Sequence, residues 1–114
     1  MKVIYIAGPY RDKRGEYYVH QNIRAAEEWA QLVWGMDAVA LCPHLNTRFF
    51  GGLLPDEVWL KGDKELLRRC DAVMVIPGWE LSAGTTKELD FAKSIHKPMF
   101  FTAHDLLLWL EESE

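Results

Sequence analysis

The sequence predicts a doubly wound α/β fold, in which helices cover both faces of a parallel sheet in a three-layer α/β/α arrangement. Four short apolar runs alternate along the chain with longer segments whose apolar residues recur every three or four positions. This alternation is typical of parallel strands joined by crossover helices. The chain has 114 residues, of which 49% are hydrophobic and 26% are charged, so it is long enough for a sizeable core. We expect residues 1–114 to form one domain.

The first strand and helix occupy the first third of the chain. Residues 3–7 predict a buried strand, and Gly8-Pro9 ends it in a turn. A polar loop is expected at residues 10–18. Apolar residues at helical spacing then predict an amphipathic helix that ends near Gly35. Those residues are Val19, Ile23, Ala26, Ala30 and Val33.

The next elements continue the alternation. Residues 38–42 predict the second strand. Residues 43–55 hold turn residues and two adjacent glycines, and their number is typical of a functional loop. A helix over residues 56–69 and a third strand over residues 72–76 follow. We expect the helix after that strand to end near His96.

A last strand at residues 98–101 and a terminal helix around Leu106 and Leu110 complete the pattern. We expect the strand order 2-1-3-4, as in Rossmann-like and flavodoxin-like folds. With that order the direction of winding reverses between the first and third strands, and ligands bind in the crevice at such a point. Residues 8–11 and 77–88 follow these two strands, so the sequence predicts a site between them.

Composition excludes several classes of function. The formal net charge is -4 and the basic residues are mixed with acids, which argues against a nucleic-acid polymer as partner, because such binding needs a clustered cationic surface. Cys42 and Cys70 are the only cysteines and form no CxxC pair, so both are expected as core thiols. The four histidines share no metal-ligand spacing, and we expect neither a metal nor a cofactor.

No targeting or membrane segment is expected. The apolar run at residues 3–6 is too short for a signal peptide. No stretch approaches the roughly 20 apolar residues that a membrane span needs. We therefore expect a cytoplasmic protein with no membrane partner.

Glu88 is the leading candidate for chemistry. The third strand opens through the small residues Ser82-Ala83-Gly84 into a helix, and such a junction leaves backbone N–H groups free to bind an anion. At helical spacing Glu88 shares a stripe with Phe91 and Ile95, which directs its carboxylate inward. The alternative is structural, because Thr85-Thr86-Lys87-Glu88 matches a capping box in which the Glu reaches back to the N-cap N–H.

Asp63 is the second carboxylate of interest. It lies four residues after Trp59, on an apolar stripe that continues to Cys70. Burial there should raise its pKa and make it a candidate proton donor, or a hydrogen-bond partner for a heterocycle. In the alternative, Asp63 is solvated at the edge of the stripe or pairs with Arg68 or Lys61.

The turn after the first strand delivers Gly8, Tyr10 and Arg11 to the same crevice. Arg11 suits a phosphate, because its planar guanidinium can donate two charge-assisted hydrogen bonds to phosphate oxygens. Ser82 and the N–H groups near Gly84 would supply the remaining donors. In the alternative, Arg11 is a surface residue of a basic loop and Gly8 only permits the turn.

Three side chains with aromatic or imidazole rings are weaker candidates for substrate binding. His44 follows the second strand at its carboxyl end, but a lone histidine beside Pro43 is more often hydrogen-bonded in a turn than catalytic. Trp79 and Phe49 could stack on a base, although aromatic side chains in a small domain usually belong to the core.

At these residues the chain resembles the nucleoside 2-deoxyribosyltransferase superfamily, and most closely its 2'-deoxynucleoside 5'-phosphate N-hydrolases. The resemblance covers most of the domain and implies that Glu88 is the nucleophile that attacks C1' of the sugar. It also implies that Asp63 contacts the base or assists its departure. The motifs and the resemblance together predict eight substrate-binding residues: Tyr5, Gly8, Tyr10, Arg11, His44, Ser82, Gly84 and Thr85.

Position 82 separates the branches of this superfamily. An acidic residue commonly stands there in the transferases that use unphosphorylated nucleosides, whereas the hydrolases carry a serine that binds the 5'-phosphate. Ser82 therefore indicates the hydrolase branch. A carboxylate would repel a dianionic phosphate, while a hydroxyl at a helix N-terminus can donate to it. Residues 48–52 have no counterpart in the family pattern, and no tail clearly supplies the neighbouring-subunit residues that the transferases use.

We therefore expect cleavage of the N-glycosidic bond of a (2'-deoxy)nucleoside 5'-monophosphate through a covalent glycosyl intermediate on Glu88. The products would be the free base and the sugar phosphate. The alternatives are base exchange by a deoxyribosyltransferase, a nucleotide-binding module without catalysis, and a phosphoribohydrolase of the lysine-decarboxylase-like group. The expected partner is a small nucleotide or nucleoside. The resemblance also implies a homodimer or a higher homo-oligomer.

Overall fold

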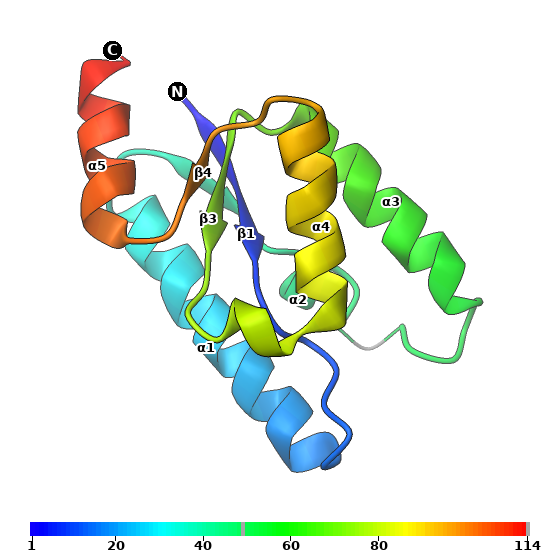
Figure 1. The fold of residues 1–114 in the computed structure, drawn as a ribbon. Coiled ribbons are helices and arrows are strands. Elements are labelled where there is room, and N and C mark those ends of the chain that lie inside the picture. Colours follow the sequence, from blue (N-terminus) through cyan, green and yellow to red (C-terminus); the bar gives the residue numbers. More distant parts are fainter. Residues whose placement is uncertain (49, 114) are drawn as a thin grey trace.

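A computed structural model describes residues 1–48 and 50–113. Strands and helices alternate in it as the sequence predicts (Figure 1). The strands are β1 (Val3–Ala7), β2 (Val39–Leu41), β3 (Ala72–Val75) and β4 (Met99–Phe100). The helices are α1 (Glu16–Trp34), α2 (Pro43–Asn46), α3 (Asp56–Arg69), α4 (Ala83–Ser94) and α5 (Ala103–Glu112), with a short 3-10 helix, η1 (Trp79–Leu81).

The four strands form a parallel sheet in the order β2-β1-β3-β4, which confirms the predicted order. The central strand β1 pairs on both sides, with Tyr5 opposite Leu41 of β2 and Val73 of β3. The carboxyl ends of β1 and β3 therefore lie next to each other. This is the point at which the winding reverses and at which α/β folds bind their ligands.

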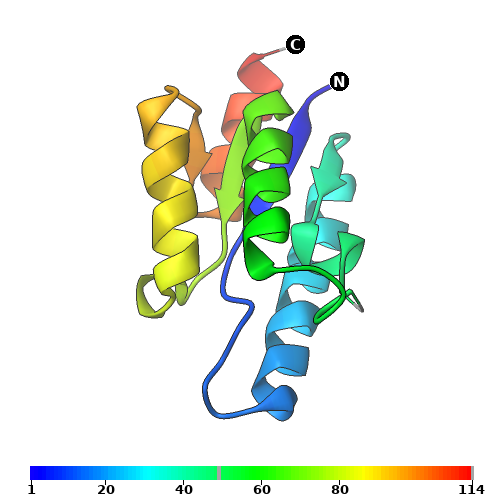
Figure 2. The same ribbon diagram turned by 90° about the vertical axis from the view of Figure 1, so that its right-hand side faces the viewer.

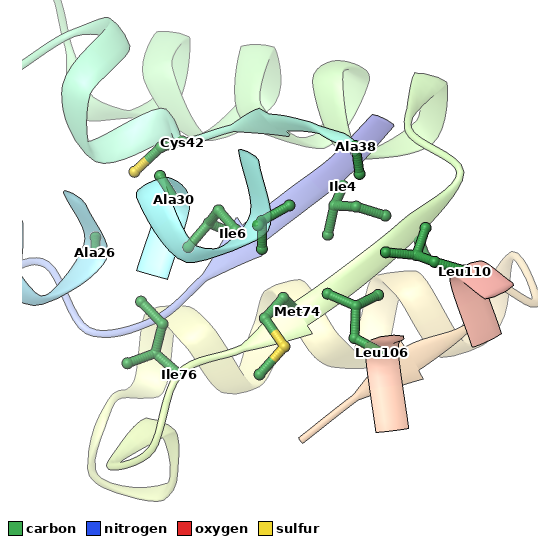
Figure 3. Close-up of a cluster of buried hydrophobic side chains, with 12 residues drawn as sticks. Ile4, Ile6, Ala26, Ala30, Ala38, Cys42, Met74, Ile76, Leu106 and Leu110 are labelled. Atoms are coloured by element: carbon green, nitrogen blue, oxygen red, sulfur yellow. The ribbon is translucent and has the colours of Figure 1, made fainter. Parts of the chain in front are cut away.

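Helices cover both faces of the sheet, with α1 and α5 on one side and α3 and α4 on the other (Figures 1 and 2). Successive side chains of a strand point to opposite faces. Ile4 and Ile6 accordingly enter the cluster under α1 and α5, which Figure 3 shows, while Tyr5 and Ala7 enter the cluster under α3 and α4. Burial on both faces explains why these strands read as continuous apolar runs.

Several details qualify the predicted elements. Residues 43–55 are not wholly a loop, because the one-turn helix α2 begins at Pro43; proline suits this first helical position, where no N–H partner is needed. Helix α1 begins at Glu16, inside the expected polar loop.

Cys42 and Cys70 are buried free thiols, as predicted. In the described part of the chain, no helix has the length and apolar content to cross a bilayer.

Candidate active site

A cavity of about 830 Å³ opens at the carboxyl edge of the sheet. Its walls come from the turn after β1, from α2, from the first turns of α3 and from the η1–α4 junction. It takes in every predicted site residue except Tyr5. The predicted residues that line it are Gly8, Tyr10, Arg11, His44, Asp63, Ser82, Gly84, Thr85 and Glu88. Segments far apart in the sequence thus meet in one place.

Glu88 lies in the second turn of α4 and reaches the cavity from the buried side of that helix. The Tyr5 hydroxyl donates a hydrogen bond to its Oε2. The pKa of Glu88 is raised to about 7, mainly by burial and also by the nearby charge of Asp63, while the hydrogen bond from Tyr5 opposes the shift. Glu88 is therefore a desolvated carboxyl group poised to titrate near neutral pH.

The alternative role of Glu88 as a helix cap is wrong. The N-cap of α4 is Ser82, whose Oγ accepts the N–H of Thr85 at 3.2 Å. Counting from Ser82, Glu88 is the sixth helical residue, too far along to serve as the third residue of a capping box. Its carboxylate has a partner on another element, Tyr5, in place of the N-cap.

Tyr5, which the sequence predicts to bind substrate, is not among the residues that line the cavity. Its side chain is fully buried in the centre of β1. Burial, followed by the charge of Glu88, raises the pKa of Tyr5, so the hydroxyl keeps its proton and remains a donor. Tyr5 therefore fixes the orientation of the Glu88 carboxylate from its position in the sheet beneath α4.

Asp63 lies on α3, half-buried against the same cavity. Burial raises its pKa to about 6. The alternative partner Arg68 is engaged elsewhere, because it forms an ion pair with Glu65. The sequence prediction that burial would raise the pKa of Asp63 is therefore confirmed. Two carboxyl groups with raised pKa values, one from α3 and one from α4, face a shared space.

The N-terminus of α4 offers hydrogen-bond donors to the cavity. The backbone N–H groups of Ala83 and Gly84 make no hydrogen bond within the described residues. Ser82 Oγ accepts from the hydroxyl of Thr85 at 2.9 Å, which leaves the Ser82 hydroxyl hydrogen free to be donated outward. Ala83 and Gly84 line the cavity, and a side chain added at Gly84 would meet no atom closer than Ser82 Oγ at 4.0 Å, so the space beside the start of α4 is open. The arrangement suits an anion.

Arg11 and Gly8 occupy the turn on the opposite wall. The Arg11 guanidinium donates to Asp56 Oδ1 at 2.7 Å, in an exposed ion pair at the start of α3. Gly8 has a packing role: a Cβ there would lie 2.6 Å from Ile76 Cδ1 and 2.8 Å from Ile76 Cβ. The close approach of the turn to the end of β3 therefore requires glycine.

His44 is buried at the start of α2, with its Nε2 2.8 Å from the carbonyl oxygen of Pro9. This bond matches the hydrogen-bonded turn residue that the sequence favoured, and the other face of the residue lines the cavity. Trp79 does not line the cavity; it packs against the cluster under α3 and α4, and its ring centroid lies 5.7 Å from that of Phe101. This position agrees with the core role that the sequence favoured over stacking on a base, and Phe49 lies outside the described residues.

Some residues that line the cavity are not predicted as site residues from the sequence. Trp59 belongs to the stripe that holds Asp63, and its position four residues earlier on the same helix face is the signal for a shared wall. Asp56 carries no such signal, because it stands at the predicted start of a helix. Leu60 and Leu81 form exposed apolar parts of the lining, and nothing in a single sequence distinguishes them from other surface leucines.

A family described as a domain of unknown function (DUF7768) matches residues 2–102. The chain belongs to this family. A search of curated proteins finds no significant match for the DUF7768 chain. Among solved structures, its fold is similar to that of a 2-deoxyribosyltransferase from the psychrotolerant bacterium Bacillus psychrosaccharolyticus, with a TM-score of 0.65 and 20% identity over 85% of this chain and 69% of the other. The DUF7768 chain thus shares the fold that the sequence resemblance implied.

Proposed function

We propose that the chain cleaves the N-glycosidic bond of a 2'-deoxynucleoside 5'-monophosphate, with Glu88 as nucleophile and Asp63 as proton donor. The observation that carries the proposal is the convergence of these two carboxyl groups on one cavity beside the open N-terminus of α4. Glycosidases use a pair of carboxyl groups, one as proton donor and one as nucleophile or base. The similarity of the fold to a 2-deoxyribosyltransferase supports the same reaction class.

In the first step, a Glu88 oxygen forms a bond to C1' while the bond from C1' to the base nitrogen breaks, and its electron pair leaves with the base. Asp63 transfers its proton to the departing base, so that a neutral molecule leaves. The hydrogen bond from Tyr5 to Glu88 Oε2 leaves the other carboxylate oxygen to attack.

In the second step, water attacks C1' of the glycosyl ester and the bond to Glu88 breaks. The now ionised Asp63 accepts the proton of that water, which restores both carboxyl groups to their starting states. No other group is required for the proton balance.

The 5'-phosphate would lie at the N-terminus of α4. The N–H groups of Ala83 and Gly84 and the Ser82 hydroxyl would donate to its oxygens. Arg11 would turn from Asp56 to the phosphate. This exchange costs little, because an exposed ion pair contributes at most about 1 kcal/mol.

A direct test is chromatography of ribo- and deoxyribonucleosides and their 5'-monophosphates after incubation with the chain. The proposal predicts free base from the deoxynucleoside monophosphates and much less from the unphosphorylated nucleosides. Base release from nucleosides alone would contradict the phosphate assignment. Binding of nucleotides with no base release would instead support the non-catalytic module.

Ser82→Asp tests the phosphate site more specifically. Aspartate caps helices as well as serine does, so α4 should persist, but its charge would repel the phosphate. We expect the KM for monophosphates to rise by at least about tenfold, with nucleosides little affected. Ser82→Asn is the matched neutral control and should retain most of the affinity. Equal effects of Ser82→Asp on nucleosides and monophosphates would refute the assignment.

Base exchange is a second candidate, because the similar fold belongs to a protein named as a transferase. The same glycosyl ester would give a new nucleotide if a second base, instead of water, attacked C1'. Adding an excess of a different free base to the incubation separates the two reactions. A new nucleotide would indicate exchange, whereas sugar phosphate as the only other product would indicate hydrolysis.

A further inference from the structure

Two polar atoms directly behind the cavity surface are not explained by the fold. His44 Nδ1 and Trp59 Nε1 are buried and have no hydrogen-bond partner among the described residues, and both belong to residues that line the cavity. Buried polar atoms are nearly always paired, because leaving them unpaired costs free energy. Both atoms are closed to water, so a ligand would reach them only as neighbouring side chains shift. Their shared location indicates a ligand that supplies one acceptor and one donor.

The hydrogen-bonding roles of the two atoms follow from their chemistry. The carbonyl oxygen of Pro9 can only accept, so His44 Nε2, 2.8 Å away, carries the ring hydrogen. His44 Nδ1 is then a bare acceptor in the neutral ring, and burial lowers the pKa of His44, which keeps the ring neutral. The indole Nε1 of Trp59 can only donate.

Asp63 is a third hydrogen-bonding group beside Trp59 Nε1 and His44 Nδ1, and these three groups form a row. It lies one helical turn after Trp59 on the same face of α3. In the proposed reaction Asp63 gives a proton to the departing base, so it must face an acceptor atom of that base. Trp59 and Asp63 are four residues apart on one face of α3 and are therefore direct neighbours, whereas the acceptor His44 is on α2. In the inferred row the acceptor stands at one end, beside the two adjacent donors.

The strand order places this row at the base end of a bound nucleotide. Helix α2 follows β2 and α4 follows β3, with β1 between them. Neighbouring strands are about 4.8 Å apart, so roughly 10 Å of sheet edge separates the α4 N-terminus from α2. With the phosphate at α4 and C1' at Glu88, the base extends toward α2 and the first turns of α3.

We propose that Trp59, Asp63 and His44 form a donor-donor-acceptor row that selects guanine and cytosine over adenine, thymine and uracil. Guanine presents two acceptors, N7 and O6, followed by the N1–H donor, and cytosine presents O2 and N3 followed by an N4–H donor. Adenine, thymine and uracil alternate acceptor, donor, acceptor, which sets N–H against a protein donor and leaves His44 without a hydrogen. The inference rests on the proposed function for the direction of the nucleotide.

The test measures binding, so that it does not depend on turnover. Glu88→Ala is titrated in a calorimeter at pH 5.5, below the pKa of about 6 of Asp63, so that this group holds its proton. The ligands are the 5'-monophosphates of deoxyguanosine, deoxycytidine, deoxyadenosine and deoxyuridine. The row predicts that the guanine and cytosine nucleotides bind at least about tenfold more tightly than the adenine and uracil nucleotides. Equal or tighter binding of the adenine or uracil nucleotide would overturn it.

Three further substitutions in the Glu88→Ala background assign the effect to the row. His44→Leu removes the Nδ1 acceptor without supplying another, and should reduce the preference to about threefold or less. Trp59→Phe should weaken the guanine and cytosine nucleotides at least fivefold, whereas Trp79→Phe, at a tryptophan outside the cavity, should not. An unchanged preference in His44→Leu, or equal behaviour of the two tryptophan variants, would contradict the row.

2-Deoxyribose 5-phosphate serves as the internal control, because it carries the phosphate and the sugar but no base. It should bind equally to all of these variants, which a general loss of structure would not allow. The proposed function and the base preference of the row can be disproved independently of each other. Absence of base release by the unaltered chain would remove the function, while loss of base preference in calorimetry would remove the row.

Discussion

Glu88 and Asp63 owe their properties to burial. Removal from water raises the pKa of Glu88 to about 7 and that of Asp63 to about 6. For the proposed reaction Glu88 must be ionised to attack C1', and Asp63 must hold a proton to give to the base. Because the group that must be ionised has the higher pKa, only a minority of molecules hold the productive combination, and this combination is most populated between the two pKa values.

The pH dependence of kcat/KM is the first prediction. Protonation of the nucleophile should reduce the rate at low pH, and deprotonation of the acid should reduce it at high pH. Because the pair titrates with pKa values of about 6 and about 7, we expect a narrow bell with its maximum between these values. Base release measured from pH 4.5 to 9 provides the profile. A rate that is flat across this range would contradict the assignment of both groups.

Tyr5→Phe should move this profile. The Tyr5 hydroxyl donates to Glu88 and so stabilises its ionised form. Without that donor the pKa of Glu88 should rise, and the maximum of the profile should shift to higher pH with a lower rate. A loss of rate at all pH values with no shift would show that Tyr5 acts only by packing.

Stability should also report the burial of Glu88. An exposed Glu in the unfolded chain titrates near 4.3, whereas burial raises the pKa in the folded chain to about 7. The folded form then binds more protons between these values, so its free energy of unfolding falls as the pH rises through this window. The stabilisation is complete below the lower value and lost above the higher one.

Glu88→Gln should remove this contribution, which amounts to about 2–3 kcal/mol between pH 5 and pH 8 at about 1.4 kcal/mol per pKa unit. Urea unfolding at pH 5 and pH 8 measures it as a difference between the variant and the unaltered chain. We expect the unaltered chain to lose more stability over this interval. Equal losses would mean that Glu88 titrates alike in the folded and unfolded states.

Among the elements, the turn after β1 depends on a close contact with the end of β3. A Cβ at Gly8 would lie 2.6 Å from Ile76 Cδ1 and 2.8 Å from Ile76 Cβ, and the latter atom cannot rotate away. Overpacking of this kind costs roughly 1–3 kcal/mol. Gly8→Ala should therefore lower the midpoint of thermal unfolding. Gly84→Ala is the control, because the nearest atom there is 4.0 Å away, and a similar loss in both variants would contradict this account.

The sequence predicted the elements well, because each strand is apolar on both faces and each long helix has a clear stripe. The boundaries of β1 and α3 agree with the prediction, and the other strands are shorter at one or both ends. The short helix α2 was missed, because four residues after a proline carry no periodicity. The capping alternative for Glu88 was resolved only by the structure, since Ser82 and Thr85 are both ordinary N-cap residues in a sequence.

For the whole molecule, strand order does most to create the candidate site. Because β1 lies between β2 and β3, the three segments that follow these strands converge on one cavity. The sequence could predict this meeting from the fold class alone. It could not predict the ion pair of Arg11 with Asp56 or the unpaired atoms of His44 and Trp59, because these depend on side-chain packing between elements.

The central claim is that Glu88 carries the proposed chemistry. Its most direct test compares the rate of free-base release, followed by chromatography, between the unaltered chain and Glu88→Ala, with nucleotide binding to both measured by calorimetry. We expect Glu88→Ala to release base at least about a thousandfold more slowly while its affinity for the nucleotide changes little. Base release by Glu88→Ala at a rate close to that of the unaltered chain would contradict the claim.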